Sequence, residues 1–178
     1  IKFQTFKRDR LILKQSPSAN YHKEAVGEDD DWYKRLERES LNEDDFKELF
    51  NYCKQKNIIF LSTPYEKESV DLLERINVPA YKISSGDITN LPLLEYISQK
   101  NKPIILSTGM SDLNEIEKAI EIIKQQGNNQ IIILQCTANY PIKIEESNLN
   151  VIKTLKNTFG LITGYSDHTI GNLAVISA

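Results

Sequence analysis

Short apolar runs rich in β-branched residues recur along the chain and predict a set of buried parallel strands. Nearly continuous apolar character, rather than alternation, is typical of strands that are covered on both faces. From the second run onward, the runs start about 23 to 30 residues apart, which is the length of one strand, one helix and two turns. The six runs are Ile1–Phe6, Ile58–Leu61, Ala80–Ile83, Ile104–Leu106, Ile131–Leu134 and Leu161–Gly164.

Apolar residues at helical spacing lie between these runs and predict helices. Asn42 is a suitable N-cap for the first stripe, and Asp112 with Glu115 resembles a capping box before the third. Gly127 and Gly160 are expected to end the last two helices. The stripes are Phe46, Leu49, Phe50 and Cys53; Leu93, Leu94 and Ile97 behind Pro92; Ile116, Ala119, Ile120 and Ile123; and Val151, Ile152, Leu155 and Phe159.

The first interval is longer than the others, and its segment from residue 7 to about residue 40 is expected to be a long loop on the first strand-to-helix connection. It contains Ser16-Pro17-Ser18 and the acidic run Glu28-Asp29-Asp30-Asp31, followed by Trp32-Tyr33. Most charge runs form solvated surface, and this is the expectation here. His22 in the same segment is also expected to be exposed.

Alternation of strand and helix predicts an α/β fold, as either a doubly wound sheet or a (β/α)8 barrel. No G-x-G-x-x-G motif and no P-loop follows any strand, which disfavours the nucleotide-binding doubly wound folds. The uniform repeats favour the barrel. Six strands cannot close an eight-stranded barrel, and the chain opens without Met, so we expect a piece of a longer protein.

The amino-acid composition excludes some classes of partner. The 178 residues include 22 Lys and Arg against 25 Asp and Glu, so the chain has no strong field and nucleic acid is not an expected partner. No apolar run approaches the roughly 20 residues of a membrane helix, and no signal peptide is expected. The two cysteines cannot form a disulfide framework. We therefore expect a cytoplasmic protein without a membrane partner.

Polar residues, most of them hydroxyl-bearing, stand at the ends of the predicted strands. The carboxyl ends of parallel strands meet at one edge, where α/β proteins place their chemistry, so these residues are candidates for a shared anion site. Ser and Thr are also common at strand ends because they make turns and caps, and this alternative stays open. The groups are Gln4-Thr5, Ser62-Thr63, Ser84-Ser85, Ser107-Thr108, Gln135-Cys136-Thr137 and Ser166-Asp167-His168.

Two lysines and one histidine strengthen the anion-site interpretation. Lys2 and Lys82 lie inside apolar strands, where an ammonium is costly to bury unless an anion faces it. Two lysines directed into a barrel mouth suit a phosphate and a carboxylate, although an internal ion pair with an acidic residue such as Asp87 is equally open. His168 follows Asp167, and such a pair at a strand end could give a divalent metal one nitrogen ligand.

Six motifs at these strand ends resemble the sialic acid synthase family, the phosphoenolpyruvate-dependent nonulosonate synthases. They occur in family order and cover essentially the whole chain outside the long first loop. The motifs are Lys2-Phe3-Gln4-Thr5-Phe6, Phe60-Leu61-Ser62-Thr63-Pro64, Tyr81-Lys82-Ile83-Ser84-Ser85-Gly86-Asp87, Pro103-Ile104-Ile105-Leu106-Ser107-Thr108-Gly109-Met110, Cys136-Thr137 with Tyr140-Pro141, and Gly164-Tyr165-Ser166-Asp167-His168-Thr169.

The resemblance implies that residues 1–178 are a partial TIM-barrel catalytic domain containing the second to the seventh strand. The first and eighth strands and a C-terminal antifreeze-like domain would lie outside it. It implies a transferase that condenses phosphoenolpyruvate with an open-chain N-acetylmannosamine-type sugar, giving a nine-carbon sialic or legionaminic acid and phosphate. It also implies a homodimer for the full-length protein and no turnover by the fragment alone.

The resemblance also assigns roles by position. Lys2, Lys82 and His168 would be catalytic, and His168 would be one of two histidines that hold a divalent cation, Mn or Mg. Substrate-binding residues would be Thr63, Ser85, Ser107 and Ser166, together with the two lysines, for phosphoenolpyruvate, and Gln4 and Tyr140 for the sugar.

The chain departs from the family pattern at two positions beside the Cys-Thr pair. Gln135 stands where the family often has His, and Ala138 stands where Asn or Ser is common near the phosphate. Contacts to the phosphate are therefore the part of the site that the resemblance defines least. Ser62-Thr63-Pro64 fits the sialic and legionaminic branches better than the pseudaminic one.

Two other functions remain open from the sequence. A Schiff-base aldolase on the same fold would use Lys82 as its amine nucleophile, although no Tyr or Glu is clearly placed for proton transfer. A non-catalytic sugar-phosphate-binding or structural fragment is the second alternative.

Overall fold

The computed structural model describes residues 1–19, 23, 27 and 31–178. His22 and the first three residues of the acidic run lie outside the described residues. The chain forms two compact units, Ile1–Val78 and Pro79–Ala178, which are described in turn. That residues 1–178 make up one catalytic domain stays a prediction.

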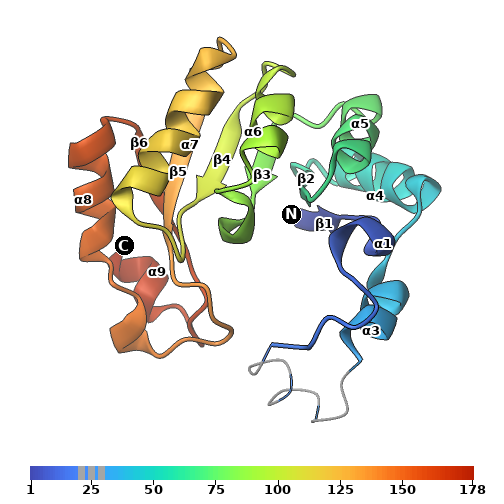
Figure 1. The fold of residues 1–178 in the computed structure, drawn as a ribbon, viewed down its shortest axis with the longest axis horizontal. Helices are drawn as coiled ribbons and strands as arrows, with labels where there is room; N and C mark the ends of the chain where they lie inside the picture. Colours follow the sequence, from blue (N-terminus) through green and yellow to red (C-terminus); the bar gives the residue numbers. More distant parts are fainter. Residues whose placement is uncertain (20–22, 24–26, 28–30) are drawn as a thin grey trace. The chain divides into compact units, whose positions relative to one another are not determined.

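Unit 1 contains a pair of parallel strands and four described helices. Its strands pair with Lys2 opposite Leu61 and Thr5 opposite Pro64, and helix α5 packs on the second strand. In chain order the elements are β1 (Lys2–Thr5), α1 (Arg8–Leu11), α3 (Trp32–Glu39), α4 (Glu43–Gln55), β2 (Leu61–Pro64) and α5 (Lys67–Arg75); Figure 1 shows them in blue to green.

The second strand lies later in the chain than the apolar run at Ile58–Leu61 predicts. Ile58 and Ile59 are 51% and 68% exposed, and the strand begins only at Leu61. The reason is register: β1 begins at Lys2, whose partner is Leu61, so the residues before Leu61 have no β1 residue opposite them beyond Ile1. Ser62 and Thr63 therefore belong to the strand itself rather than to a following loop.

The long loop predicted from residue 7 to about residue 40 is wrong for the described part of that segment, which contains α1 and α3. Helix α3 has almost no apolar stripe because Leu36 is its one buried apolar residue. It begins at the N-cap Asp31, whose carboxylate accepts from the Lys34 N–H at 3.1 Å. The last residue of the acidic run is thus a helix cap and not merely solvated surface.

Helix α3 is held to α1 mainly by polar contacts. The Arg8 guanidinium lies 2.8 Å from the Glu37 carboxylate and 4.1 Å from the centre of the Tyr33 ring, and the Tyr33 hydroxyl donates to Asp9. Hydrophobic periodicity does not report such contacts, which explains why the sequence pattern missed this helix.

Helix α4 begins where the sequence predicts. The Asn42 side-chain oxygen accepts from the N–H groups of Asp44 and Asp45 at 2.8 and 3.0 Å, and the Asp45 carboxylate accepts from the Asn42 N–H at 2.8 Å. This reciprocal capping box satisfies donors that the first helical turn leaves unpaired. Phe46 and Cys53 of the predicted stripe are buried.

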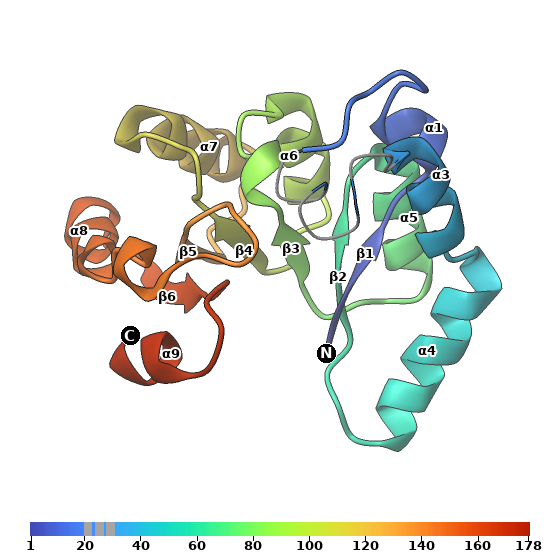
Figure 2. The same cartoon turned by 90° about the horizontal axis from the view of Figure 1, so that it is seen from below.

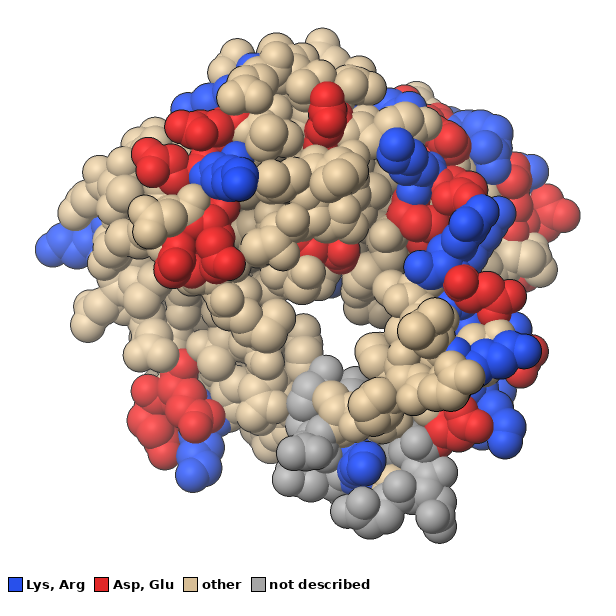
Figure 3. All heavy atoms as spheres, in the orientation of Figure 1, with Lys and Arg blue, Asp and Glu red and all other residues tan. Residues whose placement is uncertain are grey.

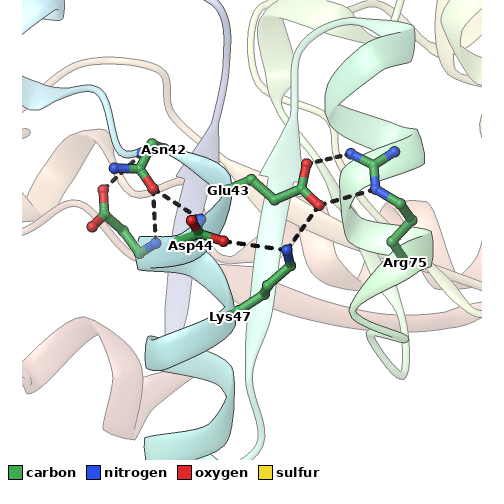
Figure 4. A network of polar contacts seen from close by, with 6 residues as sticks. Asn42, Glu43, Asp44, Lys47 and Arg75 are labelled. Carbon is green, nitrogen blue, oxygen red and sulfur yellow. Dashed lines mark hydrogen bonds and ion pairs between the residues drawn. The ribbon is translucent and has the colours of Figure 1, made fainter.

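An ion-pair network joins α4 to α5 (Figure 4). The Glu43 carboxylate accepts from two nitrogens of the Arg75 guanidinium at 2.7 and 3.2 Å and lies 3.2 Å from Lys47 Nζ. Hydrogen bonds from Arg75, and then from Lys47, lower the pKa of Glu43 to about 2. Lys47 also reaches Asp44 at 3.3 Å.

Unit 2 is a four-stranded parallel sheet in the chain order β3-β4-β5-β6. Figures 1 and 2 show α6, α7 and α8 along one face of this sheet. The elements are β3 (Tyr81–Ile83), the 3-10 turn η1 (Ser85–Asp87), α6 (Leu91–Ser98), β4 (Ile104–Ser107), α7 (Leu113–Gln125), β5 (Ile131–Cys136), the 3-10 turn η2 (Ile144–Glu146), α8 (Asn150–Phe159), β6 (Ile162–Ser166) and α9 (Leu173–Ser177).

The predicted helix signals of unit 2 are confirmed. Asp112 and Glu115 form the expected capping box on α7, and Pro92 lies in the first turn of α6. Gly127 and Gly160 follow their helices with φ of +82° and +63°, a backbone region that glycine enters without the Cβ penalty of other residues.

The core of unit 2 lies between the sheet and its helices. Side chains from β3, β4, β5 and all three covering helices are fully buried there, and each such aliphatic side chain contributes about 1.5 to 3 kcal/mol. They include Tyr81, Ile83, Leu94, Ile97, Ile104, Leu106, Ile123, Ile133 and Leu155. This packing fixes where the four strands end, and with it the positions of the polar residues at those ends.

Surface charge is mixed. On the face shown in Figure 3, Lys and Arg lie among Asp and Glu, and neither sign forms one continuous patch. None of the helices in the described part of the chain is both long enough and apolar enough to cross a membrane.

The Glu43 network gives a pH-dependent stability prediction. Ionised Glu43 stabilises the fold above its unfolded pKa of about 4.5, and this contribution is lost as the pH falls toward about 2. Glu43→Gln should therefore lower the melting temperature at about pH 7 and lose this effect as the pH falls from about 4.5 toward about 2. Thermal unfolding across this pH range measures it.

The matched control is Asp44→Asn on the same helical turn. Asp44 contacts Lys47, its side chain is 91% exposed and it does not reach the Arg75 guanidinium, so little change is expected. Equal losses for the two variants would contradict a specific contribution from the bond between α4 and α5.

Candidate active site

Unit 1 carries three of the predicted site residues on neighbouring positions of β1 and β2. Lys2 and Gln4 lie on one face of β1, as strand alternation predicts, and both are exposed. Thr63 is buried and pairs in register with Gln4. Gln4 and Thr63 are therefore adjacent, while their roles toward phosphoenolpyruvate and sugar stay predictions.

One hydroxyl pair predicted at the strand ends of unit 1 has an internal role. Thr5 Oγ1 and Ser62 Oγ lie 2.7 Å apart, and both side chains are buried. This hydrogen bond links β1 to β2 across the sheet. For this pair, the interpretation of strand-end hydroxyls as structural groups describes the geometry better than the anion-site interpretation.

In unit 2, four adjacent strands end in polar residues on the same edge of the sheet. Ser107, Cys136 and Ser166 are the last residues of β4, β5 and β6, and Ser85 opens the 3-10 turn two residues after β3. The strands are parallel and neighbouring, so their ends are adjacent as well. The structure thus brings Ser85, Ser107 and Ser166 to the edge that the sequence predicted.

Lys82 is buried in the centre of β3, with 6% of its surface exposed. Its Nζ donates to the Ile83 carbonyl oxygen at 2.6 Å and to the Ser107 hydroxyl oxygen on the neighbouring strand. An ammonium withdrawn from water requires such oxygens. The contact with Ser107 directs the cation toward the carboxyl edge of the sheet.

The alternative ion pair of Lys82 with Asp87 is not favoured by the surroundings of Asp87. Burial raises the pKa of the Asp87 carboxyl, and a hydrogen bond from Asn90 at 3.4 Å opposes the rise. An adjacent ammonium would lower this pKa instead. The environment of Asp87 is therefore that of a carboxyl without a nearby cation.

The Ser85 hydroxyl is held by the main chain of the next strand end. Its oxygen accepts from the Gly109 N–H at 3.0 Å, a buried hydrogen bond between the end of β3 and the end of β4. The Lys82–Ser107 bond runs between the same two strands in the opposite direction. Both hydroxyl oxygens accept from within the protein, so each hydroxyl proton points elsewhere.

Cys136 lies at the centre of the edge. Its Sγ is 4.0 Å from both ring nitrogens of His168. Burial raises the pKa of the Cys136 thiol, but hydrogen bonds with His168, Ser85 and Ser166 outweigh this effect, and the net shift is downward. From the sequence, Cys136 was expected at this strand end, but no role was predicted for it. Its place in the group of strand-end residues was the feature that could have indicated one.

His168 has a defined ring orientation. Its Nδ1 lies 2.7 Å from the Thr137 carbonyl oxygen, which can only accept, so Nδ1 carries a proton. The half-buried ring also lies against Tyr140, with ring centres 4.0 Å apart. The contact with Cys136 raises the pKa of His168, and burial opposes this. Tyr140 and His168 are thus brought together, while their roles toward the sugar and a metal stay predictions.

Asp167 does not act as the hydrogen-bond partner of His168. Its carboxylate accepts from the Thr169 N–H at 2.8 Å and from the Tyr165 hydroxyl at 3.1 Å. The first of these bonds is the main reason why the pKa of Asp167 is lowered. Asp167 therefore shapes the turn that carries His168, and the expected Asp-His pair is replaced by a bond from His168 to a backbone carbonyl.

The two departures from the family pattern have different structural consequences. Gln135 is buried and its side-chain amide donates to the Ser147 carbonyl oxygen at 3.2 Å, so it fastens the η2 segment to β5. Thr137 makes a second bond of this kind to the Glu146 carbonyl at 2.9 Å. Ala138 is half-buried beside Gly109 and presents only a methyl group.

The donor chemistry of His168 fits one position of a metal site. With Nδ1 bonded to a carbonyl, Nε2 is the ring atom whose lone pair could bind a metal, and this backbone contact is a common way to orient a ligating histidine. The described residues contain no group of three or more His, Cys, Asp or Glu side chains suited to a metal. His168 is the residue of this edge that would hold a divalent cation.

The NeuB family model matches residues 1–178. N,N'-diacetyllegionaminic acid synthase of Campylobacter jejuni is 42% identical over 96% of this chain and 52% of the relative. Pseudaminic acid synthase of Helicobacter pylori is 33% identical over the whole chain and 52% of the relative. The chain spans about half the length of the curated relatives that it matches.

A solved structure extends this similarity to the fold. The crystal structure of an N-acetylneuraminic acid synthetase from Leptospira borgpetersenii matches with a TM-score of 0.83 and 31% identity, over 99% of this chain and 58% of that one. The expected fold class, an α/β fold of the TIM-barrel type present in part, is confirmed. The chain belongs to the NeuB family, a sialic acid synthase-type family.

Proposed function

We propose that the full-length protein condenses phosphoenolpyruvate with an open-chain 2-acetamido sugar to a nine-carbon 2-keto acid and phosphate. The observation that carries this proposal is the buried ammonium of Lys82, bonded to Ser107 at the edge that also holds Ser85, Ser166 and His168. This is a site for a small, highly charged anion beside a potential metal ligand. The greater identity to a legionaminic than to a pseudaminic acid synthase supports a legionaminic rather than a pseudaminic acid product.

The protein's main task in this reaction is to hold the anionic substrate in one orientation. Lys82 offsets its negative charge in a poorly hydrated position, where an electrostatic contact is stronger than in water. Ser107 and Ser85 offer hydroxyl protons whose directions are restricted, because each oxygen accepts elsewhere. Lys2, on a separate strand, is proposed to contact the same substrate.

The reaction itself needs no covalent intermediate on the protein. The enol carbon of phosphoenolpyruvate attacks the sugar aldehyde, and positive charge develops at the phosphate-bearing carbon. Water adds to this carbon, and the carbon–oxygen bond to phosphate then breaks, which leaves the 2-keto acid. Holding the reactants in the attacking geometry is therefore the main source of acceleration from the protein's own residues.

His168 is proposed to bind a divalent cation, Mn or Mg, through Nε2. When bound, such a cation supplies a Lewis acid for the sugar aldehyde. The residue's own contribution is orientation, because the Thr137 carbonyl fixes the ring. Tyr140, whose ring lies tilted against that of His168, and Gln4 are proposed to contact the sugar.

A Schiff-base aldolase is disfavoured by the contacts of Lys82. An amine nucleophile needs an available lone pair and a nearby group for proton transfer. Lys82 Nζ contacts the Ile83 carbonyl oxygen and the Ser107 hydroxyl, and neither is the Tyr or Glu side chain that such a proton transfer would use. These contacts suit an ammonium that binds an anion.

The reaction is tested with the full-length protein, phosphoenolpyruvate, Mn²⁺ and a panel of sugars that carry one or two acetamido groups. We expect phosphate release that depends on one of these sugars, with a 2-keto acid formed in equal amount. EDTA should abolish both signals. Phosphate release that continues in EDTA would contradict the metal role, and its absence with every sugar would contradict the reaction.

Substitution of Lys82 tests the anion site directly. Lys82→Met in the full-length protein should weaken phosphoenolpyruvate binding by roughly tenfold to a hundredfold, because a charge-assisted contact is lost. The fold should survive, since a buried methionine replaces a buried lysine. Calorimetric titration measures binding, and melting temperature reports folding.

Lys124→Met on the exposed side of α7 is the matched control and should bind phosphoenolpyruvate like the parent protein. An unfolded Lys82→Met variant would indicate that Lys82 serves an internal ion pair. Unchanged binding by a folded variant would remove Lys82 from the site.

The cation role of His168 has a readout independent of turnover. His168→Asn should weaken Mn²⁺ binding by roughly tenfold or more, as measured by the electron paramagnetic resonance signal of free Mn²⁺. Tyr140→Phe, which keeps the ring beside His168, should bind Mn²⁺ like the parent protein. Equal Mn²⁺ affinity of the parent and His168→Asn would exclude His168 as a ligand.

A further inference from the structure

Gly109 is the one glycine of the strand-end edge that is enclosed on several sides. A Cβ built at this position would lie 2.9 Å from Ser85 Oγ, 3.0 Å from the Cys136 carbonyl oxygen and 3.3 Å from Ala138 Cβ. The distance to Ser85 Oγ is shorter than real Cβ contacts, and the other two are tighter than most of them, so these neighbours would have to shift by a few tenths of an ångström. The residue is thus confined between the end of β3 and the end of β5, while it belongs to the end of β4.

Backbone conformation does not explain glycine at this position. Gly127 and Gly160 have positive φ and open space around them, so they serve helix ends. Gly109 has no such φ value, and its distinguishing feature is the lack of room for a side chain. The reason for glycine here is the close approach of neighbouring groups.

The closest of these groups is the Ser85 hydroxyl, and the contact is a hydrogen bond from the Gly109 N–H at 3.0 Å. A hydroxyl group has one proton to donate. With its oxygen accepting from Gly109, that proton points away from the β4 end.

We propose that Gly109 is a positioning residue that holds the Ser85 hydroxyl as a hydrogen-bond donor toward the anionic substrate. Two features of the residue serve this role: its N–H fixes the Ser85 oxygen, and its missing side chain lets that oxygen approach. The inference deepens the proposed function and rests on it, since Ser85 is there a ligand of phosphoenolpyruvate.

Gly109→Ala in the full-length protein is the test, with phosphoenolpyruvate binding measured by calorimetric titration. The added methyl group displaces Ser85, so affinity should fall about tenfold, the size of one lost hydrogen bond to a charged ligand. Gly86→Ala is the matched control. Its Cβ would meet only Ser84 Oγ at 3.9 Å, an ordinary contact, so affinity should stay within about twofold.

A double-mutant cycle separates positioning from general damage. If Gly109 acts through Ser85, then Gly109→Ala should cost less than about threefold in a Ser85→Ala background. Independent tenfold losses in the two backgrounds would overturn the proposal, as would a folded Gly109→Ala variant that binds like the parent protein.

The cycle also decides the case in which Gly109→Ala fails to fold. Folding recovered in the double variant Ser85→Ala/Gly109→Ala would locate the conflict at the Ser85 hydroxyl and support the proposal. Failure of both variants would locate it at the Cys136 carbonyl and overturn the proposal. Failure of the proposed function is a separate result, because the parent protein itself would then not bind phosphoenolpyruvate.

Discussion

The burial of an ammonium inside a parallel sheet determines which groups must surround it. Lys82 has apolar neighbours along β3, and its charge is tolerated because the Ile83 carbonyl and the Ser107 hydroxyl lie within hydrogen-bonding distance. Both oxygens lie toward the carboxyl edge of the sheet. The fold can therefore bury Lys82 only because that edge is polar. The positive charge of Lys82 in turn makes the edge attractive to an anion.

Much of the fold could be predicted because buried strands and helices need apolar residues at a regular spacing along the sequence. The strands of unit 2 and the capped helices α4 and α7 follow from apolar runs, caps and glycine stops. Helix α3 could not be predicted this way, since its packing relies on Arg8, Tyr33 and Glu37 rather than on an apolar stripe. The shifted β2 depends on pairing register, which two separate apolar runs do not specify.

The same distinction applies to the site. Lys82 and Ser107 could be predicted because a charge within an apolar run and a hydroxyl at its end are visible in the sequence. The parts that were missed act mainly through the main chain: the Gly109 N–H and the Thr137 carbonyl. Every residue has a backbone N–H or carbonyl group of the same kind, so the sequence does not show which hydroxyl or ring such a group will bind. Only the structure shows this.

The loops that follow β5 and β6 share main-chain bonds. His168 donates from its ring to the Thr137 carbonyl, and its own carbonyl accepts from the Ile142 N–H at 3.0 Å. A change in the conformation of one loop would therefore break its bonds to the other. Engineering of substrate preference by grafting residues 137–142 from a relative would therefore have to transfer residues 167–169 as well, because a single transplanted loop would face a mismatched neighbour.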